Sequence, residues 1–298
     1  MKTKASLLCT VDVGNTRTKF CIWREQDEDV PAFEFVDGSN TYETTMEWLF
    51  NLPIGNAQTV NWIISSVNSY KSDFLKENIH KSRPHDVVRM ISLVDIPLTV
   101  HYDFPERLGL DRAVAAYAGI NLIGLGRPFL VIDVGTAATI DYIDSQGVFR
   151  GGAILPGPRL AAEALQTKTA NLPILEDPEK ADLTFKMNNG RSEVLTYPAT
   201  ETHNAIRLGV VFTLIGAIVS FLWKTRRAII EKNEDPSQLS LLLAGGDGHF
   251  TKCNLEDYFN DMDAALEFTV PRPEIIVEPR LVLLGLKTLA ASKSFIWE

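Results

Sequence analysis

Two short segments combine an aspartate, a glycine and a neighbouring hydroxyl side chain, and these residue types are well suited to chemistry on phosphates. Val11-Asp12-Val13-Gly14-Asn15-Thr16 recurs as Ile132-Asp133-Val134-Gly135-Thr136-Ala137. A carboxylate at the end of a strand can hold a hydrated cation, and the backbone N–H groups of the glycine turn can bind phosphate oxygens. A single Asp-x-Gly segment is ordinary turn chemistry. Its repetition favours a phosphate-binding function.

A third glycine turn supports a nucleotide as the ligand. Ala244-Gly245-Gly246-Asp247-Gly248 follows a predicted strand, and an α/β sheet carries its ligand loops at the carboxyl ends of its strands. The chain has no GxxxxGK[ST] motif, and Gly124-Leu125-Gly126-Arg127-Pro128-Phe129 lacks the third glycine of a dinucleotide fingerprint. The sequence therefore predicts a nucleotide site that is neither a P-loop nor a Rossmann site.

The elements that must position these turns alternate between strands and helices. Buried strands are predicted over Leu7–Val13, Asn61–Ser65, Phe129–Val134 and Leu239–Ala244, and helices over Tyr42–Phe50, Asp111–Ile123, Arg159–Gln166, Ala205–Thr225 and Arg280–Ala291. This alternation predicts an α/β protein. Segments 24–40 and 231–238 are rich in charged residues, Pro and Asn, and are predicted to be loops.

The repeat predicts two related halves, residues 1–125 and 126–298, with a boundary near Gly124–Pro128. The first half carries the first phosphate turn, and the second half carries the other two turns. A chain of 298 residues is long enough for two such domains. The last helix could pack back on the first half.

The composition of the chain limits which partners the protein could bind and where in the cell it is expected. The chain is 45% hydrophobic and 22% charged with a net charge of −9, which predicts a soluble globular protein and disfavours nucleic-acid binding. The three cysteines lack metal-ligand spacing, which predicts reduced thiols in the cytoplasm. The five histidines also lack such spacing, so no transition-metal site is expected. The uncharged run Leu208–Trp223 is shorter than the roughly 20 apolar residues of a membrane span, so a core or interface helix is predicted.

With its three turns, the sequence resembles the acetate and sugar kinase, Hsp70 and actin superfamily. That resemblance implies two ribonuclease-H-like domains with an interdomain nucleotide cleft. A narrower resemblance is to the type III pantothenate kinases. It is carried, besides the first turn, by Tyr102-x-x-Pro105-x-x-Leu108-Gly109-x-Asp111-Arg112, Asp133-x-Gly135-Thr136-Ala137-x-Thr139-x-Asp141, Gly151-Gly152-x-Ile154-x-Pro156-Gly157, Leu165-x-x-x-Thr169-Ala170-x-Leu172-Pro173 and Thr202-x-x-Ala205-Ile206-x-x-Gly209. Glu201 departs from the family, which often has asparagine there.

The resemblance implies an ATP-dependent pantothenate kinase that phosphorylates the terminal hydroxyl of pantothenate to 4'-phosphopantothenate, the first step of coenzyme A biosynthesis. It further implies Mg²⁺, a monovalent cation (K⁺ or NH₄⁺) and a homodimer. The short apolar run and the cysteines separately predict a cytoplasmic protein with no membrane partner. Two alternatives remain open. One is another small-molecule kinase of the superfamily, and the other is a transcriptional regulator similar to the Bvg accessory factors.

For the acceptor substrate, the resemblance implies that Asp111 is the catalytic base and that Tyr102, Gly109, Leu110, Arg112 and Thr202 bind pantothenate. Each of three side chains also has a purely structural explanation. Asp111 could cap the helix that follows it, Arg112 could pair with an acidic surface neighbour, and Tyr102 could be a core ring.

For ATP and its cations, the resemblance implies a second set of residues. The ATP-binding set is Asp12, Val13, Gly14, Asn15, Thr16, Arg17, Thr18, Lys19, Thr136, Gly245 and Gly246. Asp12 is the expected Mg²⁺ residue, through water, and Asp133 is the expected ligand of the monovalent cation. Lys19 could instead face solvent from the second strand of its hairpin.

Overall fold

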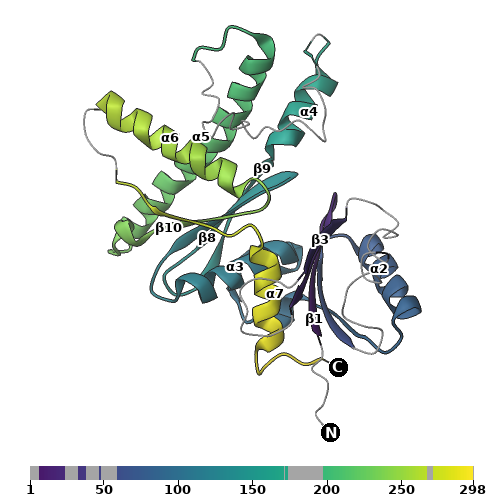
Figure 1. The fold of residues 1–298 in the computed structure, drawn as a ribbon. Helices are drawn as coiled ribbons and strands as arrows, with labels where there is room; N and C mark the ends of the chain where they lie inside the picture. Colours follow the sequence, from purple (N-terminus) through teal and green to yellow (C-terminus); the bar gives the residue numbers. More distant parts are fainter. Residues whose placement is uncertain are drawn as a thin grey trace. The chain divides into compact units, whose positions relative to one another are not determined.

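A computed structural model describes residues 7–23, 33–37, 47, 59–170, 172–173, 197–266 and 271–297 (Figure 1). The chain forms two compact units: unit 1 ends at Ile123 and resumes at Arg280, and unit 2 is Gly124–Pro279. The C-terminal residues from Arg280, which lie in the second half of the sequence, thus belong to unit 1. The helix predicted over Tyr42–Phe50 lies outside the described residues except for Glu47, which is helical.

Unit 1 contains a five-stranded sheet in the order β3-β2-β1-β4-β5. Its strands are β1 (Leu7–Val13), β2 (Thr18–Trp23), β3 (Phe33–Asp37), β4 (Val60–Ser66) and β5 (Val87–Met90). The first three are antiparallel neighbours, whereas β4 is parallel to β1 and β5 is parallel to β4.

Strand β3 corrects the loop prediction for residues 33–37, whereas the rest of the segment 24–40 lies outside the described residues. It pairs with β2 along its length, and Phe35 packs against Phe20 with ring centroids 6.2 Å apart, while Glu34 and Val36 are exposed. Only alternate side chains of an edge strand need to be buried. In this strand the exposed positions include both Glu34 and the apolar Val36, so the sequence shows no clear alternation of apolar and polar residues.

Helices cover both faces of this sheet, with α2 (Ser69–Ser82) on the opposite side from α7 (Leu281–Ala291) (Figure 1). Leu75 and Ile79 of α2 join the core formed by β1, β2 and β4. Helix α3 (Leu110–Ile123) packs on α7, and both helices contact the sheet. The shorter elements of unit 1 are the 3-10 helices Leu93–Asp95 and Pro105–Arg107 and the strand β6 (Thr99–Val100).

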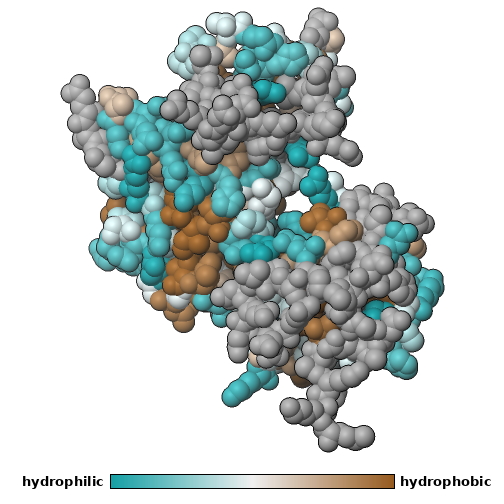
Figure 2. Space-filling model, in the orientation of Figure 1, coloured by the Kyte–Doolittle hydropathy of each residue, from teal (hydrophilic) through white to brown (hydrophobic). Residues whose placement is uncertain are grey.

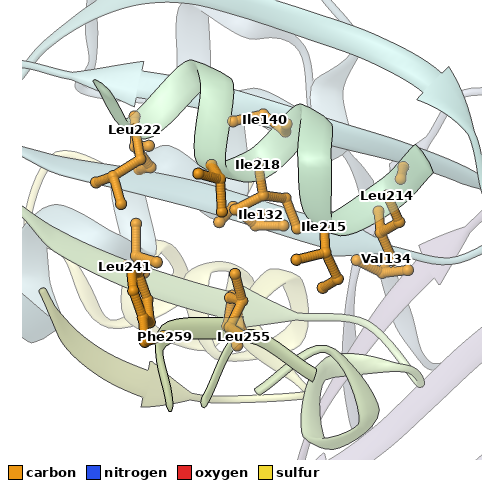
Figure 3. Close-up of a cluster of buried hydrophobic side chains, with 14 of the residues drawn as sticks. Ile132, Val134, Ile140, Leu214, Ile215, Ile218, Leu222, Leu241, Leu255 and Phe259 are labelled. Atoms are coloured by element: carbon orange, nitrogen blue, oxygen red, sulfur yellow. The ribbon is translucent and has the colours of Figure 1, made fainter. Parts of the chain in front are cut away.

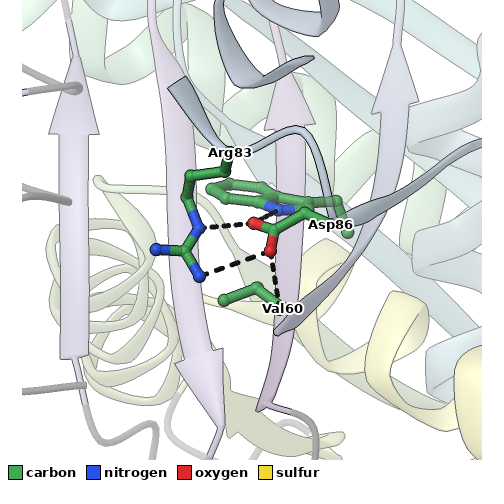
Figure 4. Close-up of polar contacts among 4 residues, drawn as sticks. Val60, Arg83 and Asp86 are labelled. Atoms are coloured by element: carbon green, nitrogen blue, oxygen red, sulfur yellow. Dashed lines mark hydrogen bonds and ion pairs between the residues drawn. The ribbon is translucent and has the colours of Figure 1, made fainter. Parts of the chain in front are cut away.

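A buried carboxylate ties the connection between α2 and β5 to the start of β4 (Figure 4). Asp86 accepts hydrogen bonds from the backbone N–H of Val60 (3.0 Å) and from Nε1 of Trp62 (2.9 Å), and it forms an ion pair with Arg83. The Asp86 side chain is only 2% exposed, so these donors replace the water it loses on folding.

Unit 2 repeats the strand connections of unit 1. Its strands β7 (Phe129–Val134), β8 (Ala137–Ile143), β9 (Val148–Pro156), β10 (Ser240–Ala244) and β11 (Glu274–Val277) follow the order β9-β8-β7-β10-β11. Here too the first three strands in the chain are antiparallel neighbours, and the next two add in parallel. The repeated sequence segments therefore begin two units of the same topology, which confirms the two-domain α/β prediction.

The core of unit 2 lies between its sheet and two long helices, α5 (Thr202–Glu231) and α6 (Gly248–Leu266) (Figure 3). Ile218 and Leu222 of α5 and Phe259 of α6 are buried against strand residues such as Ile132. The remaining helices of the unit are α4 (Pro158–Lys168) and the 3-10 helix Pro236–Gln238.

Among the described helices, α5 is the one long and apolar enough to cross a bilayer. It buries one stripe of side chains in the core of unit 2. Length and composition are therefore weak grounds for a membrane span. The three cysteines are free thiols, with Cys9 and Cys21 buried and Cys253 exposed.

Candidate active site

The first phosphate turn closes the β1–β2 hairpin. The backbone N–H of Gly14 donates to the carbonyl oxygen of Arg17 at 3.0 Å. A Cβ at position 14 would lie 2.9 Å from that oxygen, so the turn can close this tightly only with glycine. Asn15, Thr16 and Arg17 are exposed at its tip, as contact with a ligand requires.

The hairpin register places Lys19 directly opposite Asp12. Cross-strand partners share a face of the sheet, so the ammonium group and the carboxylate lie on the same side. Both residues are half-buried, and Lys19 therefore does not simply face solvent. The flanking residues Val13 and Thr18 are buried, so they support the turn from below rather than present side chains to a ligand.

The second turn closes the β7–β8 hairpin, where the N–H of Gly135 donates to the carbonyl oxygen of Ala137 at 3.0 Å. Asp133 is half-buried and Thr136 is exposed, as are their counterparts Asp12 and Thr16 in the first hairpin. The second connection is one residue shorter, because Val134 pairs with Ala138 whereas Val13 pairs with Thr18.

The structure brings the third glycine turn onto Asp133. Because Asp133 is in register with Ala244, the chain leaves β10 beside it. Gly245 has a φ of +78°, and a Cβ there would lie 2.4 Å from both Asp133 Oδ1 and the carbonyl oxygen of Val134. Only glycine suits this backbone and this close approach. The predicted cation ligand and the predicted adenosine loop are therefore neighbours.

A fourth segment, at the end of the Gly151–Gly157 motif, packs against the second turn. The N–H of Gly157 donates to the carbonyl oxygen of Thr136 at 3.0 Å, and a Cβ on Gly157 would lie 2.0 Å from the carbonyl oxygen of Gly135. Helix α4 begins at the next residue, Pro158. In the sequence, the Pro156-Gly157 pair of the motif is the feature from which this packing against the second turn could have been predicted.

The predicted base lies in the first turn of α3. Oδ1 of Asp111 accepts a hydrogen bond from the N–H of Arg112 at 2.8 Å, and a Cβ on Gly109 would lie only 2.5 Å from Oδ1. Gly109 therefore leaves the space that the carboxylate occupies. Arg112 is buried, Leu110 and Tyr102 are half-buried, and all of these residues belong to unit 1.

Thr202 is the first residue of α5 and belongs to unit 2, so it does not share a unit with the other predicted substrate residues. The side chain of the preceding Glu201 caps the helix by accepting hydrogen bonds from the N–H groups of His203 and Asn204. Together with a contact to the His203 ring, these bonds lower the pKa of Glu201 to about 2. Glutamate at the position where the family often has asparagine still performs the capping function.

One charged side chain at the first hairpin is outside every motif. Nζ of Lys71, from α2, donates to the carbonyl oxygen of Asn15 at 2.8 Å. The 56 residues between the two positions explain why local sequence patterns do not connect them.

Several known proteins are similar in sequence to this chain. The family model described as type III pantothenate kinase matches residues 8–224. A type III pantothenate kinase of Persephonella marina is 28% identical over 269 residues, covering 88% of this chain and 96% of the relative. Its Synechococcus elongatus counterpart is 35% identical over 205 residues, covering 68% of this chain and 66% of the relative.

Among solved structures, a protein of Campylobacter jejuni described as belonging to the Baf family of transcriptional activators is 21% identical, with a TM-score of 0.49 and coverage of 95% and 96% of the two chains. The family model spans both phosphate hairpins, the Asp111 turn and the start of α5. The chain belongs to the type III pantothenate kinase family, and it is a pantothenate kinase, a phosphotransferase.

Proposed function

We propose that this enzyme transfers the terminal phosphoryl group of ATP to the terminal hydroxyl of pantothenate, with Asp111 as the base. The observation that carries the assignment is the Asp111 carboxylate, which is half-exposed at the start of α3 in space that Gly109 leaves free. As the hydroxyl oxygen bonds to phosphorus, the bond between phosphorus and the ADP oxygen breaks and the hydroxyl proton passes to Asp111. ADP and 4'-phosphopantothenate are the products.

The neighbouring residues orient the two substrates. Arg112 and Tyr102 bind the anionic acceptor, with Gly109 and Leu110 at its side. The first hairpin, from Asp12 to Lys19, holds nucleotide phosphates through its turn N–H groups and the Lys19 ammonium, and Thr136 makes the corresponding contact from the second hairpin. Gly245 and Gly246 leave room for the adenosine.

The oxygen atoms available suit the two expected cations. Asp133 Oδ1 and the carbonyl oxygen of Val134 converge on Gly245, and carboxylate and carbonyl oxygens are the ligands that hard cations prefer. Asp133 would hold the monovalent cation, which neutralises phosphate charge when bound. Asp12 would orient Mg²⁺ through water, since Mg²⁺ commonly keeps waters and binds few protein carboxylates.

The same proposal includes a cytoplasmic homodimer in which Thr202 of one subunit contacts the substrate of the other. Its support is the outer face of α5, where Phe212 is 55% exposed and Trp223 is 42% exposed beside the small residues Gly209 and Gly216. Figure 2 shows apolar side chains among hydrophilic ones on the face of the molecule that it draws. A second copy would cover such residues.

The test measures ADP release from ATP with and without pantothenate, each in Na⁺, K⁺ or cation-free buffer. Release that depends on both pantothenate and K⁺ is the expected result. Asp133→Ala should lose the K⁺ response and weaken ATP use together. Release that another small-molecule acceptor stimulates better than pantothenate would overturn the substrate assignment, and equal rates in all buffers would overturn the cation assignment.

A further inference from the structure

The burial of Lys71 is unusual for its position in α2. Lys71, Leu75 and Ile79 are spaced four residues apart and form one buried stripe of the helix. Leu75 and Ile79 belong to the apolar core, whereas Lys71 carries an ammonium group and is only 9% exposed. Burying a charge is costly unless a partner compensates it, so this lysine needs a physical explanation.

Local contacts fix the first turn of α2 beside the first hairpin. Strand β4 is in register with β1, and the N–H of Val67 donates to the carbonyl oxygen of Val13 at 3.1 Å, so both strands end at the same edge. Asn68 then caps α2, because its side chain accepts a hydrogen bond from the N–H of Lys71 at 3.1 Å. The cap holds Lys71 at the level of the phosphate turn.

The ammonium group has one neutral acceptor and no anion among the described residues. Nζ donates to the carbonyl oxygen of Asn15 at 2.8 Å, and within the described part of the chain no carboxylate forms an ion pair with it. Two of its three N–H donors are therefore open to another acceptor. The acceptor that the hairpin itself is suited to bind is a phosphate oxygen.

We propose that Lys71 is a nucleotide-binding residue of this kinase, which holds the Asn15 carbonyl and supplies positive charge to the phosphates on the Gly14–Arg17 turn. The inference rests on the proposed function, because it takes the first hairpin as the ATP phosphate site. By tying the turn to α2, Lys71 also keeps the backbone of the hairpin in one conformation before the nucleotide arrives. Sequence motifs miss it because its partner is far away in the chain.

The direct test compares Lys71→Met with Lys76→Met, a matched change that removes an exposed lysine from the same helix. Loss of a charge-assisted contact to phosphate should raise the Kd of ATP about tenfold in Lys71→Met, equivalent to about 1.4 kcal/mol. The increase should be smaller for AMP than for ATP, because AMP has a single phosphate. The KM of pantothenate should change less than twofold, and Lys76→Met should behave as wild type.

Lys71→Arg keeps the charge and should recover most of the ATP affinity, which a purely steric role of the lysine stem would not predict. ATP affinity of Lys71→Met equal to that of Lys76→Met would overturn the inference. So would an equal loss of affinity for ATP, AMP and pantothenate, because that pattern indicates a general structural defect.

A second measurement on the wild-type enzyme covers the case in which Lys71→Met does not fold. The ¹⁵Nζ NMR resonance of Lys71, assigned by its absence in Lys71→Arg, should shift on addition of ATP and stay in place on addition of adenosine. A resonance that ATP does not move would overturn the inference. Wild-type protein that binds no nucleotide would instead overturn the proposed function, so the two failures are distinguishable.

Discussion

At the scale of single residues, the site depends on glycines that leave space for carboxylates. A Cβ on Gly109 would lie 2.5 Å from Asp111 Oδ1, and a Cβ on Gly245 would lie 2.4 Å from Asp133 Oδ1. A carbon atom cannot approach an oxygen that closely without displacing it. These glycines therefore serve to place the oxygen atoms on which the proposed chemistry depends.

Asp111→Asn should retain the fold and ATP affinity but lose at least about 10²-fold in kcat, because the amide cannot accept the hydroxyl proton. Steady-state kinetics measure the loss, and circular dichroism checks that α3 is intact. Turnover close to wild type would remove Asp111 from the proposed mechanism.

Gly245→Ala should destabilise unit 2 by at least about 2 kcal/mol, since alanine suffers both the positive φ and the collision with Asp133. Gly246→Ala is the control, because no atom lies within 4 Å of a Cβ there and its φ is not in the left-handed region. Urea unfolding of the two variants measures the difference. Equal midpoints would contradict the close approach at Gly245.

At the scale of elements, buried carboxylates fix the connections between strands. Asp86 joins the α2–β5 connection to the start of β4, and Asp144 organises the turn between β8 and β9. Each carboxylate accepts at least one backbone N–H hydrogen bond and forms an ion pair with an arginine. The sheets that present the two hairpins thus keep a fixed register.

Asp86→Ala should lower the free energy of unfolding by about 3 to 5 kcal/mol, because it leaves Arg83 and the Trp62 indole N–H without their buried acceptor. Glu77→Ala, which breaks the exposed pair with Lys81, is the control and should change stability by less than about 0.5 kcal/mol. Denaturant titration of both variants decides whether burial of the carboxylate is what matters.

The stability of the β8–β9 turn should depend on acid pH through Asp144. Burial alone would raise the pKa of Asp144, but hydrogen bonds from the N–H of Val148 and from Arg150 lower it below its ordinary value of 3.8. The carboxylate therefore stabilises the fold above that value, and its contribution disappears as the pH falls through the lower folded pKa. Urea midpoints between pH 2 and 6 should fall less steeply in Asp144→Asn than in wild type. Parallel curves would refute this role.

At the scale of the whole molecule, the proposed dimer makes each site depend on two chains. A subunit carrying Thr202→Ala and a subunit carrying Asp111→Asn should form mixed dimers in which one of two sites is intact. Random exchange would restore about a quarter of wild-type turnover, which neither parent dimer shows.

Sedimentation at assay concentration and proof of subunit exchange accompany this mixing experiment. A fully active monomer would contradict the dimer, and so would demonstrated exchange that never raises turnover. The same sedimentation run on Phe212→Ser tests whether the outer face of α5 forms the contact.

Much of the fold could be predicted because each half begins with the same local pattern. The strand runs that became β1, β7 and β10 are apolar and end in glycine turns, so residues close in sequence determine them. Strand β3 was not predicted, because its hydrogen bonds depend on pairing with β2 and its exposed side chains weaken the alternation of apolar and polar residues. Helix α2 also escaped, because a lysine interrupts its apolar stripe.

The sequence by itself determined the α/β class, the family, the two phosphate turns and the Gly109-x-Asp111 spacing, because these depend on residues only a few positions apart. Only the tertiary structure decided that Gly245 lies against Asp133, that Gly157 supports the Thr136 turn and that Lys71 reaches the Asn15 carbonyl. These contacts join segments brought together by strand register and helix packing. The free energy of burying the two cores selects that arrangement, and no local spacing encodes it.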